Sequence, residues 1–379
     1  MPDLSQLASG LKRSGIRVIM DLAMGMTDIV RLEVGEPLFS TPEHIVQAGC
    51  TALQEGFTKY TPNAGILSLR EVIARRLNLD YGLNLSADNI VITVGGVGAV
   101  SSAVRALTDI GDEVLISDPC WPNYEMIIAC AGGVPKRYQL DPEQGFLPTL
   151  ANIEKVLTPK SKVLIINTPS NPLGIVYPEK VMRELVEFAR QHDLFIISDE
   201  VYEKIIFEGQ HTSALSFDRD GRVVGVFSFS NTYAMNGWRV GYAVAAAPVA
   251  DLITKLQEAY VSCTPGVAQK AAEAALTGSQ DCVAMMRDTY KANRRLALEI
   301  LDRYGISYLN PQGAFYLWID VNSPDSTAFA KELLVKHKVA VAPGDTFGPA
   351  GERYIRVSLA SPQAAIEEGL ERIGRLIRK

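Results

Sequence analysis

The 379-residue sequence lacks the cysteine and histidine patterns that mark several classes of protein. Its five cysteines are odd in number and none forms a Cys-x-x-Cys pair, which argues against a disulfide framework and against a zinc site. The four histidines lie far apart, and none has a neighbour at the spacing of metal ligands. We therefore expect reduced thiols and no bound metal.

The sequence also lacks a basic cluster and a long apolar run. Its formal net charge is −6 and its isoelectric point is near 5.4, with Lys and Arg scattered along the chain. This distribution disfavours binding to nucleic acid or to an anionic membrane. No apolar run approaches the roughly 18 residues of a membrane span, and residues 1–17 do not resemble a secretory leader. We expect a cytoplasmic protein with a small-molecule ligand.

What the sequence does contain is a series of short apolar runs rich in β-branched residues, the first at 89–94. Such runs are typical of strands buried on both faces. The other runs lie at 113–117, 163–167, 194–198, 223–228 and 241–245. Helical patterns at 99–107 and 181–189 separate some of them. This alternation predicts an α/β fold with a mainly parallel sheet covered by helices.

The pattern changes in the last third of the chain. A long helical pattern covers 254–303, strands follow within 308–321 and 339–357, and a last helix spans 362–377. A single core rarely grows beyond about 250 to 300 residues. We therefore predict a large domain over residues 31–265, and a smaller α+β domain formed by residues 1–30 and 266–379.

Polar, glycine-rich or aromatic residues follow the predicted strands at their carboxyl ends, where open parallel sheets bind ligands. The glycine-rich segment 95–99 leads into a helix whose first N–H groups suit a phosphate. Trp121, after the second strand, offers a flat surface for stacking. Asp199 follows the fourth strand, and a carboxylate is costly to bury there without hydrogen-bond donors or a cation beside it. A protonated pyridine nitrogen is such a cation.

The fifth strand continues into the segment Ser-Phe-Ser-Asn-Thr-Tyr-Ala-Met-Asn-Gly-Trp-Arg at 228–239. The hydroxyls of Ser228 and Ser230 and the guanidinium of Arg239 suit charge-assisted hydrogen bonds to a dianion. Each of these features has a structural explanation when taken alone. A purely structural explanation does not account for the order in which all of them occur along one sheet.

This order of motifs closely resembles that of class I and II aminotransferases of the fold type I pyridoxal-phosphate family, over nearly the whole chain. The resemblance implies a homodimer that uses pyridoxal or pyridoxamine phosphate and acts on an α-amino acid and a 2-oxo acid. The cofactor-binding residues that it implies are Tyr60, Gly96, Val97, Trp121, Asn171, Asp199, Tyr202, Ser228, Ser230 and Arg239. The substrate-binding residues that it implies are Gly35, Asn171 and Arg356.

The resemblance also implies individual roles. Tyr60 would reach the cofactor phosphate of the neighbouring subunit, which places the active site at a subunit interface. Asp199 would keep the pyridine nitrogen protonated, and Asn171 and Tyr202 would donate to the ring hydroxyl, so that the cofactor stays an electron sink. Cis peptide bonds are expected at Asp118–Pro119 and Asn171–Pro172.

The sequence departs from the family at a position central to catalysis. The family motif reads Ser-Phe-Ser-Lys-Thr-Tyr-Ala-Met, and here Asn231 stands at the lysine position. The family's lysine forms the resting Schiff base and later moves the proton of the substrate α-carbon. An amide nitrogen is neither nucleophilic nor basic. With Asn231, Asp199 and Tyr202 at the catalytic positions, we expect an impaired enzyme that holds its cofactor without a covalent link.

Three interpretations of Asn231 stay open. An ordinary aminotransferase carries a lysine-to-asparagine substitution that traps cofactor adducts, which we favour because the other cofactor positions match the family. Alternatively, a natural lysine-free enzyme performs another pyridoxal-phosphate reaction; Asn236, where the family usually has threonine, indicates drift near the site. The third interpretation is a non-catalytic cofactor-binding protein. The substrate side chain is not identified, because no second arginine stands in an obvious motif for a dicarboxylate.

Overall fold

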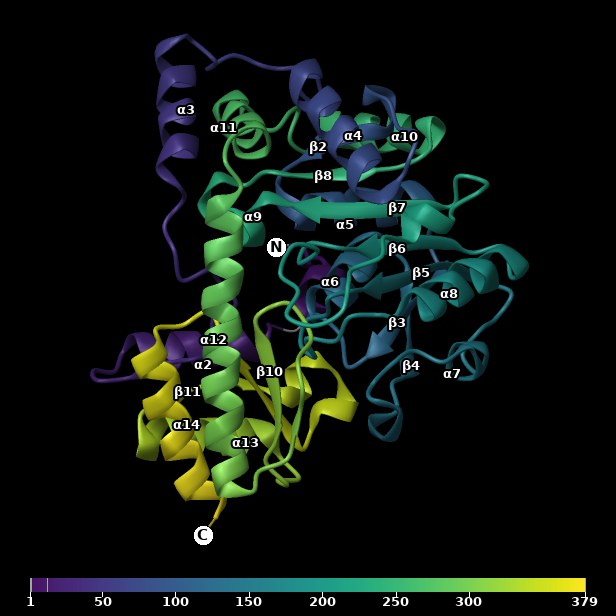
Figure 1. The fold of residues 1–379 in the computed structure, drawn as a ribbon. Helices are drawn as coiled ribbons and strands as arrows, with labels where there is room; N and C mark the ends of the chain where they lie inside the picture. Colours follow the sequence, from purple (N-terminus) through teal and green to yellow (C-terminus); the bar gives the residue numbers. More distant parts are fainter. Residues whose placement is uncertain (1, 12, 379) are drawn as a thin grey trace.

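The computed structural model describes residues 2–11 and 13–378, and its larger part is built around a seven-stranded sheet (Figure 1). The strand order is β2-β8-β7-β6-β5-β3-β4. The strands are β2 (Ile90–Thr93), β3 (Glu113–Asp118), β4 (Val134–Gln139), β5 (Ser161–Asn167), β6 (Phe195–Asp199), β7 (Val223–Ser228) and β8 (Gly241–Val244). Only β8 runs antiparallel to its neighbours, so the sheet is mainly parallel, as predicted.

Two features of this sheet were not predicted. The segment 229–240 between β7 and β8 contains only two single turns, at Phe229–Thr232 and Asn236–Trp238, whereas a parallel crossover usually contains a full helix; β8 is accordingly antiparallel to β7. β4 is an edge strand that begins Val134-Pro135 and is mostly half-buried. An edge position tolerates proline and lacks the continuous apolar run of a central strand. The apolar pattern therefore missed it.

Helices cover both faces of the sheet, because successive side chains of the central strands enter different cores. In β5, Val163 and Ile165 belong to one apolar cluster and Leu164 and Ile166 to another. On the first face, α5 (Gly95–Leu107) packs against β7 and β8, with α6 (Asn123–Cys130) and α10 (Ala247–Tyr260) beside it. The second cluster includes buried residues of α4 (Leu67–Tyr81) and α8 (Glu179–Gln191).

The smaller part of the molecule contains the C-terminal residues. Its antiparallel sheet has the order β12-β13-β10-β9, and β1 pairs with β11 in parallel. The strands are β1 (Val30–Arg31), β9 (Tyr308–Leu309), β10 (Tyr316–Asp320), β11 (Val339–Ala340), β12 (Ala342–Pro343) and β13 (Tyr354–Ser358). The helices are α12 (Asp281–Tyr304), α13 (Ser326–His337) and α14 (Gln363–Ile377). These elements have a core of their own.

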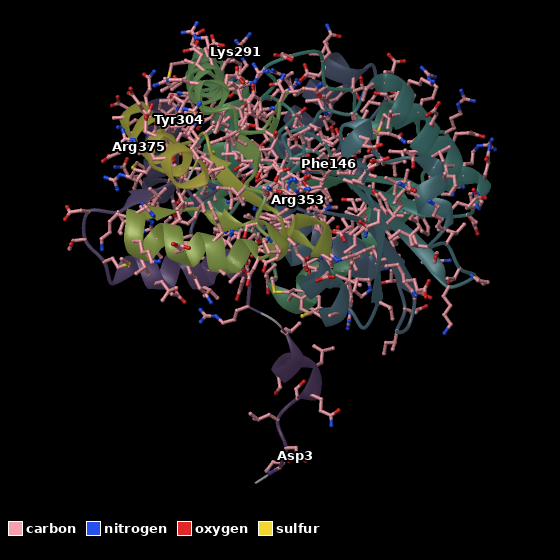
Figure 2. All side chains as sticks on the ribbon, turned by 90° about the horizontal axis from the view of Figure 1, so that it is seen from below. Asp3, Phe146, Lys291, Tyr304, Arg353 and Arg375 are labelled. Atoms are coloured by element: carbon pink, nitrogen blue, oxygen red, sulfur yellow. The ribbon has the colours of Figure 1, made fainter. Side chains whose placement is uncertain are left out.

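Of the N-terminal segment, α2 (Gly15–Met24) and β1 pack on this C-terminal part. α2 contacts α13 and β12, and β1 aligns Val30 with Val339. α1 (Gln6–Gly10) has no buried residue, and Asp3 lies at the end of an arm that projects from the body (Figure 2). No helix among residues 2–11 and 13–378 combines the length and apolar character that a bilayer crossing needs.

The helix α11 (Gly266–Thr277) bears on the predicted domain boundary. The prediction assigned residues 266–379 to the smaller domain, yet α11 packs against α3 (Glu43–Gln54) and α4. Its four buried alanines join the apolar cluster of the larger sheet. The division into domains stays a prediction, and this packing favours a boundary that follows α11.

Candidate functional site

A cavity of about 790 Å³ lies at the carboxyl ends of the sheet strands, with walls from both parts of the molecule. It brings together every site residue predicted from the sequence except Tyr60. These residues are Gly35, Gly96, Val97, Trp121, Asn171, Asp199, Tyr202, Ser228, Ser230, Asn231, Arg239 and Arg356. They come from segments up to 321 positions apart, which parallel strands and the smaller part bring to one place.

One end of the cavity is a cradle for an anion at the start of α5. Gly95 has a φ of +71°, and a Cβ there would collide with the Arg239 guanidinium. A Cβ on Gly96 would lie 2.9 Å from Val201 Cγ1. The glycines therefore let Arg239 and Ser228 approach the first N–H groups of the helix, which have no partner within it. N–H groups, hydroxyls and a guanidinium together suit a phosphate.

Asp199 ends β6 and is almost fully buried. Its carboxylate accepts hydrogen bonds from the Tyr124 hydroxyl at 2.5 Å and from the Val201 N–H at 3.4 Å, and the Asn167 amide donates to its backbone carbonyl at 2.9 Å. Burial raises the pKa of Asp199 to about 6, although the donation from Tyr124 opposes this rise. A buried carboxyl with no cationic partner in the described chain fits a ligand that carries a protonated ring nitrogen.

Tyr124 is a site residue that the sequence reasoning missed. It lies on α6, three residues after Trp121, and the two rings meet edge to face with centroids 5.3 Å apart. The i, i+3 spacing of two aromatic residues just after a strand end was the available signal. Burial raises the pKa of the Tyr124 phenol well above its usual range, so it acts as a donor.

Arg356 on β13 forms the wall from the smaller part and is also buried. Its Nη2 donates to the Glu33 carbonyl at 2.6 Å, and its Nη1 donates to Asn171 Oδ1 at 3.1 Å. The guanidinium carbon lies 4.3 Å from the centroid of the Tyr316 ring. Burial lowers the pKa of Arg356, and Nε has no partner among the described residues. A cation held by only neutral acceptors fits a substrate carboxylate.

Tyr316 is a second missed residue, and it links Arg356 to Tyr202. The Tyr202 and Tyr316 hydroxyls lie 2.7 Å apart. A Cβ on Gly35 would collide with the Tyr316 hydroxyl, so glycine is needed where this segment lines the cavity. Burial raises the pKa of both phenols, which therefore stay neutral near pH 7 and serve as hydrogen-bond donors rather than bases.

Asn231 lies on the single turn α9 (Phe229–Thr232), is 8% exposed and lines the cavity. Neither lysine nor histidine is found among the described residues of the cavity wall. Lys204, close in sequence to Tyr202, is not in that wall and pairs with Asp80 at 2.7 Å. The carboxylates of the wall are those of Glu36 and Asp199.

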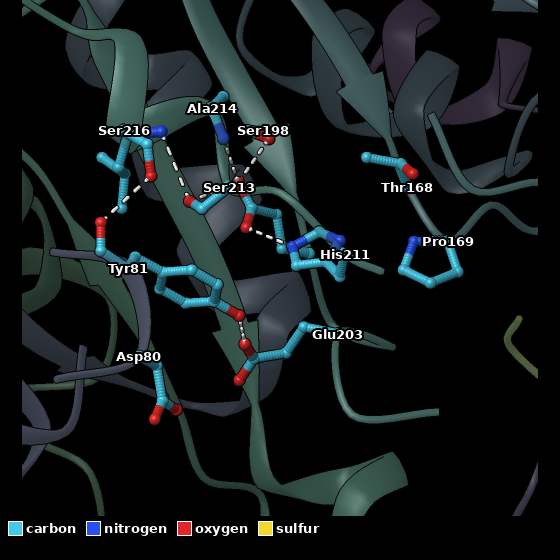
Figure 3. Close-up of polar contacts among 12 residues, drawn as sticks. Asp80, Tyr81, Thr168, Pro169, Ser198, Glu203, His211, Ser213, Ala214 and Ser216 are labelled. Carbon is cyan, nitrogen blue, oxygen red and sulfur yellow. Dashed lines mark hydrogen bonds and ion pairs between the residues drawn. The ribbon is translucent and has the colours of Figure 1, made fainter. Parts of the chain in front are cut away.

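A buried network centres on Glu200, the residue after Asp199. Figure 3 labels its partners Ser198, His211, Ser213 and Ala214. Glu200 Oε2 lies 2.8 Å from His211 Nε2. Glu200 Oε1 accepts from Ser198 Oγ at 2.7 Å, Ser213 Oγ at 3.0 Å and the Ala214 N–H at 3.1 Å. His211 thus has a structural contact. The network anchors the backbone between Asp199 and Tyr202.

Tyr60 is the one predicted site residue outside the cavity. Its side chain is 88% exposed, and it lines a separate hollow with Cys263 and Gly266. Both predicted cis peptide bonds, Asp118–Pro119 and Asn171–Pro172, are confirmed. A third cis bond, Thr168–Pro169, was not predicted.

A mainly parallel sheet with this site at its strand ends, and a smaller antiparallel sheet that adds an arginine, define a fold type I pyridoxal-phosphate protein. The chain belongs to the family described as "Aminotransferase class I and II", which matches residues 27–373. Members of this family use pyridoxal phosphate.

Individual relatives match over the full length of the chain. The chain is 35% identical to the aspartate/prephenate aminotransferase of Thermus thermophilus, with 100% of this chain and 99% of the relative covered. It is 35% identical to aromatic-amino-acid aminotransferase 2 of Thermococcus litoralis, with 99% and 98% covered. A solved structure of Thermus thermophilus aspartate aminotransferase with maleate matches with a TM-score of 0.95 and 35% identity, covering 99% of this chain and 100% of that one.

Proposed function

We propose that this protein is a pyridoxal-phosphate-dependent aminotransferase for an α-amino acid and a 2-oxo acid, in which Asn231 stands at the lysine position and prevents sustained turnover. The observation that carries this proposal is the convergence on one cavity of the anion cradle, Asp199, Arg356 and Asn231. The anion cradle, Asp199 and Arg356 suit a cofactor and an amino acid. The Asn231 amide can neither form a Schiff base nor accept a proton as an amine does.

The residues of the cavity suit the cofactor group by group. The N–H groups of Gly96 and Val97, with Ser228, Ser230 and Arg239, would hold the phosphate. Trp121 would stack on the ring, and Asp199 would keep its nitrogen protonated. When bound, the cofactor supplies an electron sink for the substrate α-carbon. Because residue 231 is not among the groups that would hold the phosphate, the cofactor should stay bound without a covalent link.

Residues of the other cavity wall, around Arg356, would orient the substrate. Arg356 offers a planar guanidinium for the α-carboxylate, with Gly35 and Asn171 beside it. Tyr202 and Asn171 would donate to the ring hydroxyl of the cofactor. The neutral phenol of Tyr202 holds its proton too tightly to act as a base near pH 7. These groups bind and orient the reactants, and none of them replaces a lysine amine.

The expected defect concerns proton transfer. A positioned general base contributes about 10² to 10⁴ in rate. No lysine or histidine lines the described part of the cavity, and the Asn231 amide is not basic. We therefore propose an enzyme that binds cofactor and substrate and does not complete the transfer of the amino group.

The proposal includes a homodimer. Tyr60 is exposed, and large apolar side chains near it in sequence or along the segment 252–261 are exposed as well. They are Leu53, Leu67, Leu252, Tyr260 and Val261. A second copy of the chain would cover such side chains and would receive Tyr60 at its own phosphate cradle. Light scattering checks this assembly; a stable monomer with full cofactor affinity would count against it.

The test of function compares the protein with Asn231→Lys. After borohydride treatment and denaturation, we expect the cofactor to be attached to the polypeptide in Asn231→Lys and not in the unchanged protein. Asn231→Lys should transaminate, whereas Asn236→Lys, which adds lysine at another position of the cavity wall, should not. Rates ordinary for aminotransferases in the unchanged protein, without a rise in Asn231→Lys, would refute the account. Cofactor binding without activity in Asn231→Lys would favour a non-catalytic homologue.

A further inference from the structure

The helix α2 is firmly seated on the smaller part of the molecule. Ile19 and Ala23, four residues apart on one face, are buried there. A Cβ on Gly15 would collide with the Thr346 hydroxyl, so glycine allows the start of the helix to lie close to that segment. α2 also contacts α13 and β12. Its orientation toward the cavity is therefore set by packing.

The adjoining side of α2 lines the cavity. Ile16, Arg17 and Met20 belong to the cavity wall. Met20 lies four residues after Ile16 and three after Arg17, so it is a neighbour of both on the helix surface. This side combines two apolar side chains with one guanidinium. An apolar surface that carries one cation is complementary to a short hydrocarbon chain that ends in an anion.

The charge of Arg17 is not neutralised within the described chain. The other cations of the cavity wall are Arg13, Arg239 and Arg356. Arg13 pairs with Asp21 at 2.9 Å, whereas the proposed function assigns a phosphate to Arg239 and an α-carboxylate to Arg356. Arg17 forms no ion pair with any residue of 2–11 or 13–378, and the contact found for its Nη1 is Met20 Sδ at 4.0 Å. Glu36, which also lines the cavity, is exposed and forms no ion pair with it.

We infer that Arg17 is a specificity-determining residue that selects amino acids and 2-oxo acids whose side chain ends in an anionic group. This inference rests on the proposed function. The α-carboxylate of the substrate lies at Arg356, its methylene groups lie along Ile16 and Met20, and its distal carboxylate or phosphate meets the Arg17 guanidinium. The fork of N–H donors in arginine suits either anion.

Equilibrium binding tests this without turnover. Isothermal titration of the cofactor-loaded protein compares butyrate, succinate and 3-phosphonopropionate, which share one carboxylate and differ at the distal end. We expect succinate or 3-phosphonopropionate to bind about tenfold more tightly than butyrate, the usual scale of a hydrogen-bonded charge pair. Whichever of these two ligands binds more tightly identifies the preferred distal group as a carboxylate or a phosphate.

Three variants make the assignment specific. Arg17→Gln should lose about tenfold in affinity for the distal anion and keep its affinity for butyrate. Arg17→Lys should lose less, because it keeps the charge but not the fork. Arg13→Gln is the matched control, because its guanidinium is already paired with Asp21 and an exposed pair contributes little.

The outcomes separate this inference from the proposed function. Cofactor that binds, together with equal affinities for succinate, 3-phosphonopropionate and butyrate, would overturn the role of Arg17 and leave the proposed function standing. If Arg17→Gln unfolds at the same temperature as the parent and still prefers the ligands with a distal anion, the role of Arg17 is overturned and the proposed function still stands. Failure of the unchanged protein to bind pyridoxal phosphate would overturn the proposed function itself.

Discussion

The Tyr124 hydroxyl donates to Asp199 Oδ2 at 2.5 Å, and both side chains are almost fully buried. This contact joins the first helix turn after β3 to the last residue of β6. The phenol favours the ionised carboxylate, whereas burial favours the neutral one, and burial has the larger effect on the pKa of Asp199. Tyr124 therefore adjusts the charge that would face a cofactor ring.

Replacement of Tyr124 by phenylalanine should weaken cofactor binding. The loss of the donor raises the pKa of Asp199 further, so that less carboxylate is ionised at neutral pH. A hydrogen bond to a charged group contributes about 1.5 to 3 kcal/mol, which corresponds to about tenfold or more in affinity. Fluorescence titration with pyridoxal phosphate measures the change. Tyr177→Phe is the control, because Tyr177 is buried and has no hydroxyl hydrogen bond to the described chain; equal effects of the two changes would contradict the prediction.

Replacement of Asp199 by asparagine should stabilise the cofactor-free protein near pH 7.5. The pKa of Asp199 is about 6 in the folded protein and about 3.9 in an unfolded chain. Because the folded-state pKa is raised, this group favours folding below about pH 4, and that contribution is lost as the pH rises to about 6. A shift of about two units corresponds to about 3 kcal/mol. Urea unfolding from pH 4.5 to 8 should show the advantage of the variant growing up to about pH 6 and then staying constant. Its affinity for pyridoxal phosphate should be lower than that of the parent. A variant less stable than the parent at pH 7.5 would refute this.

Replacement of His211 by leucine should destabilise the protein by about 3 kcal/mol, because it leaves the buried Glu200 carboxylate with one partner fewer. Urea unfolding at pH 7 measures this. Glu187→Gln is the matched control: it breaks an ion pair with Arg190 on the surface and should change the stability little. If the network also positions Asp199, His211→Leu should lower the affinity for pyridoxal phosphate under conditions where the protein stays folded. A loss below 1 kcal/mol would mean that the imidazole is not needed by Glu200.

Local sequence was sufficient for the central strands and for most of the site. The central strands are buried on both faces, so each is a continuous apolar run that can be read without its neighbours. The residues that line the cavity directly follow these runs, and parallel strands necessarily bring their carboxyl ends together. For this reason Asp199, Asn171 and Ser228 could be assigned to one site from their order alone.

Other features were decided only by packing between distant segments. β8 pairs antiparallel with β2 as well as with β7, and α11 packs on α3 and α4, which lie far from it in the sequence. The edge strand β4 lacks an apolar run. Tyr316 and Arg17 carry no motif, and they line the cavity because the smaller part is packed beside the strand ends. Arg356 donates a hydrogen bond to the backbone carbonyl of Glu33, 323 positions away. Sequence thus determined which residues follow the buried strands, whereas the tertiary structure decided which side chains from elsewhere face them, because such contacts arise from the burial of whole surfaces rather than from local spacing.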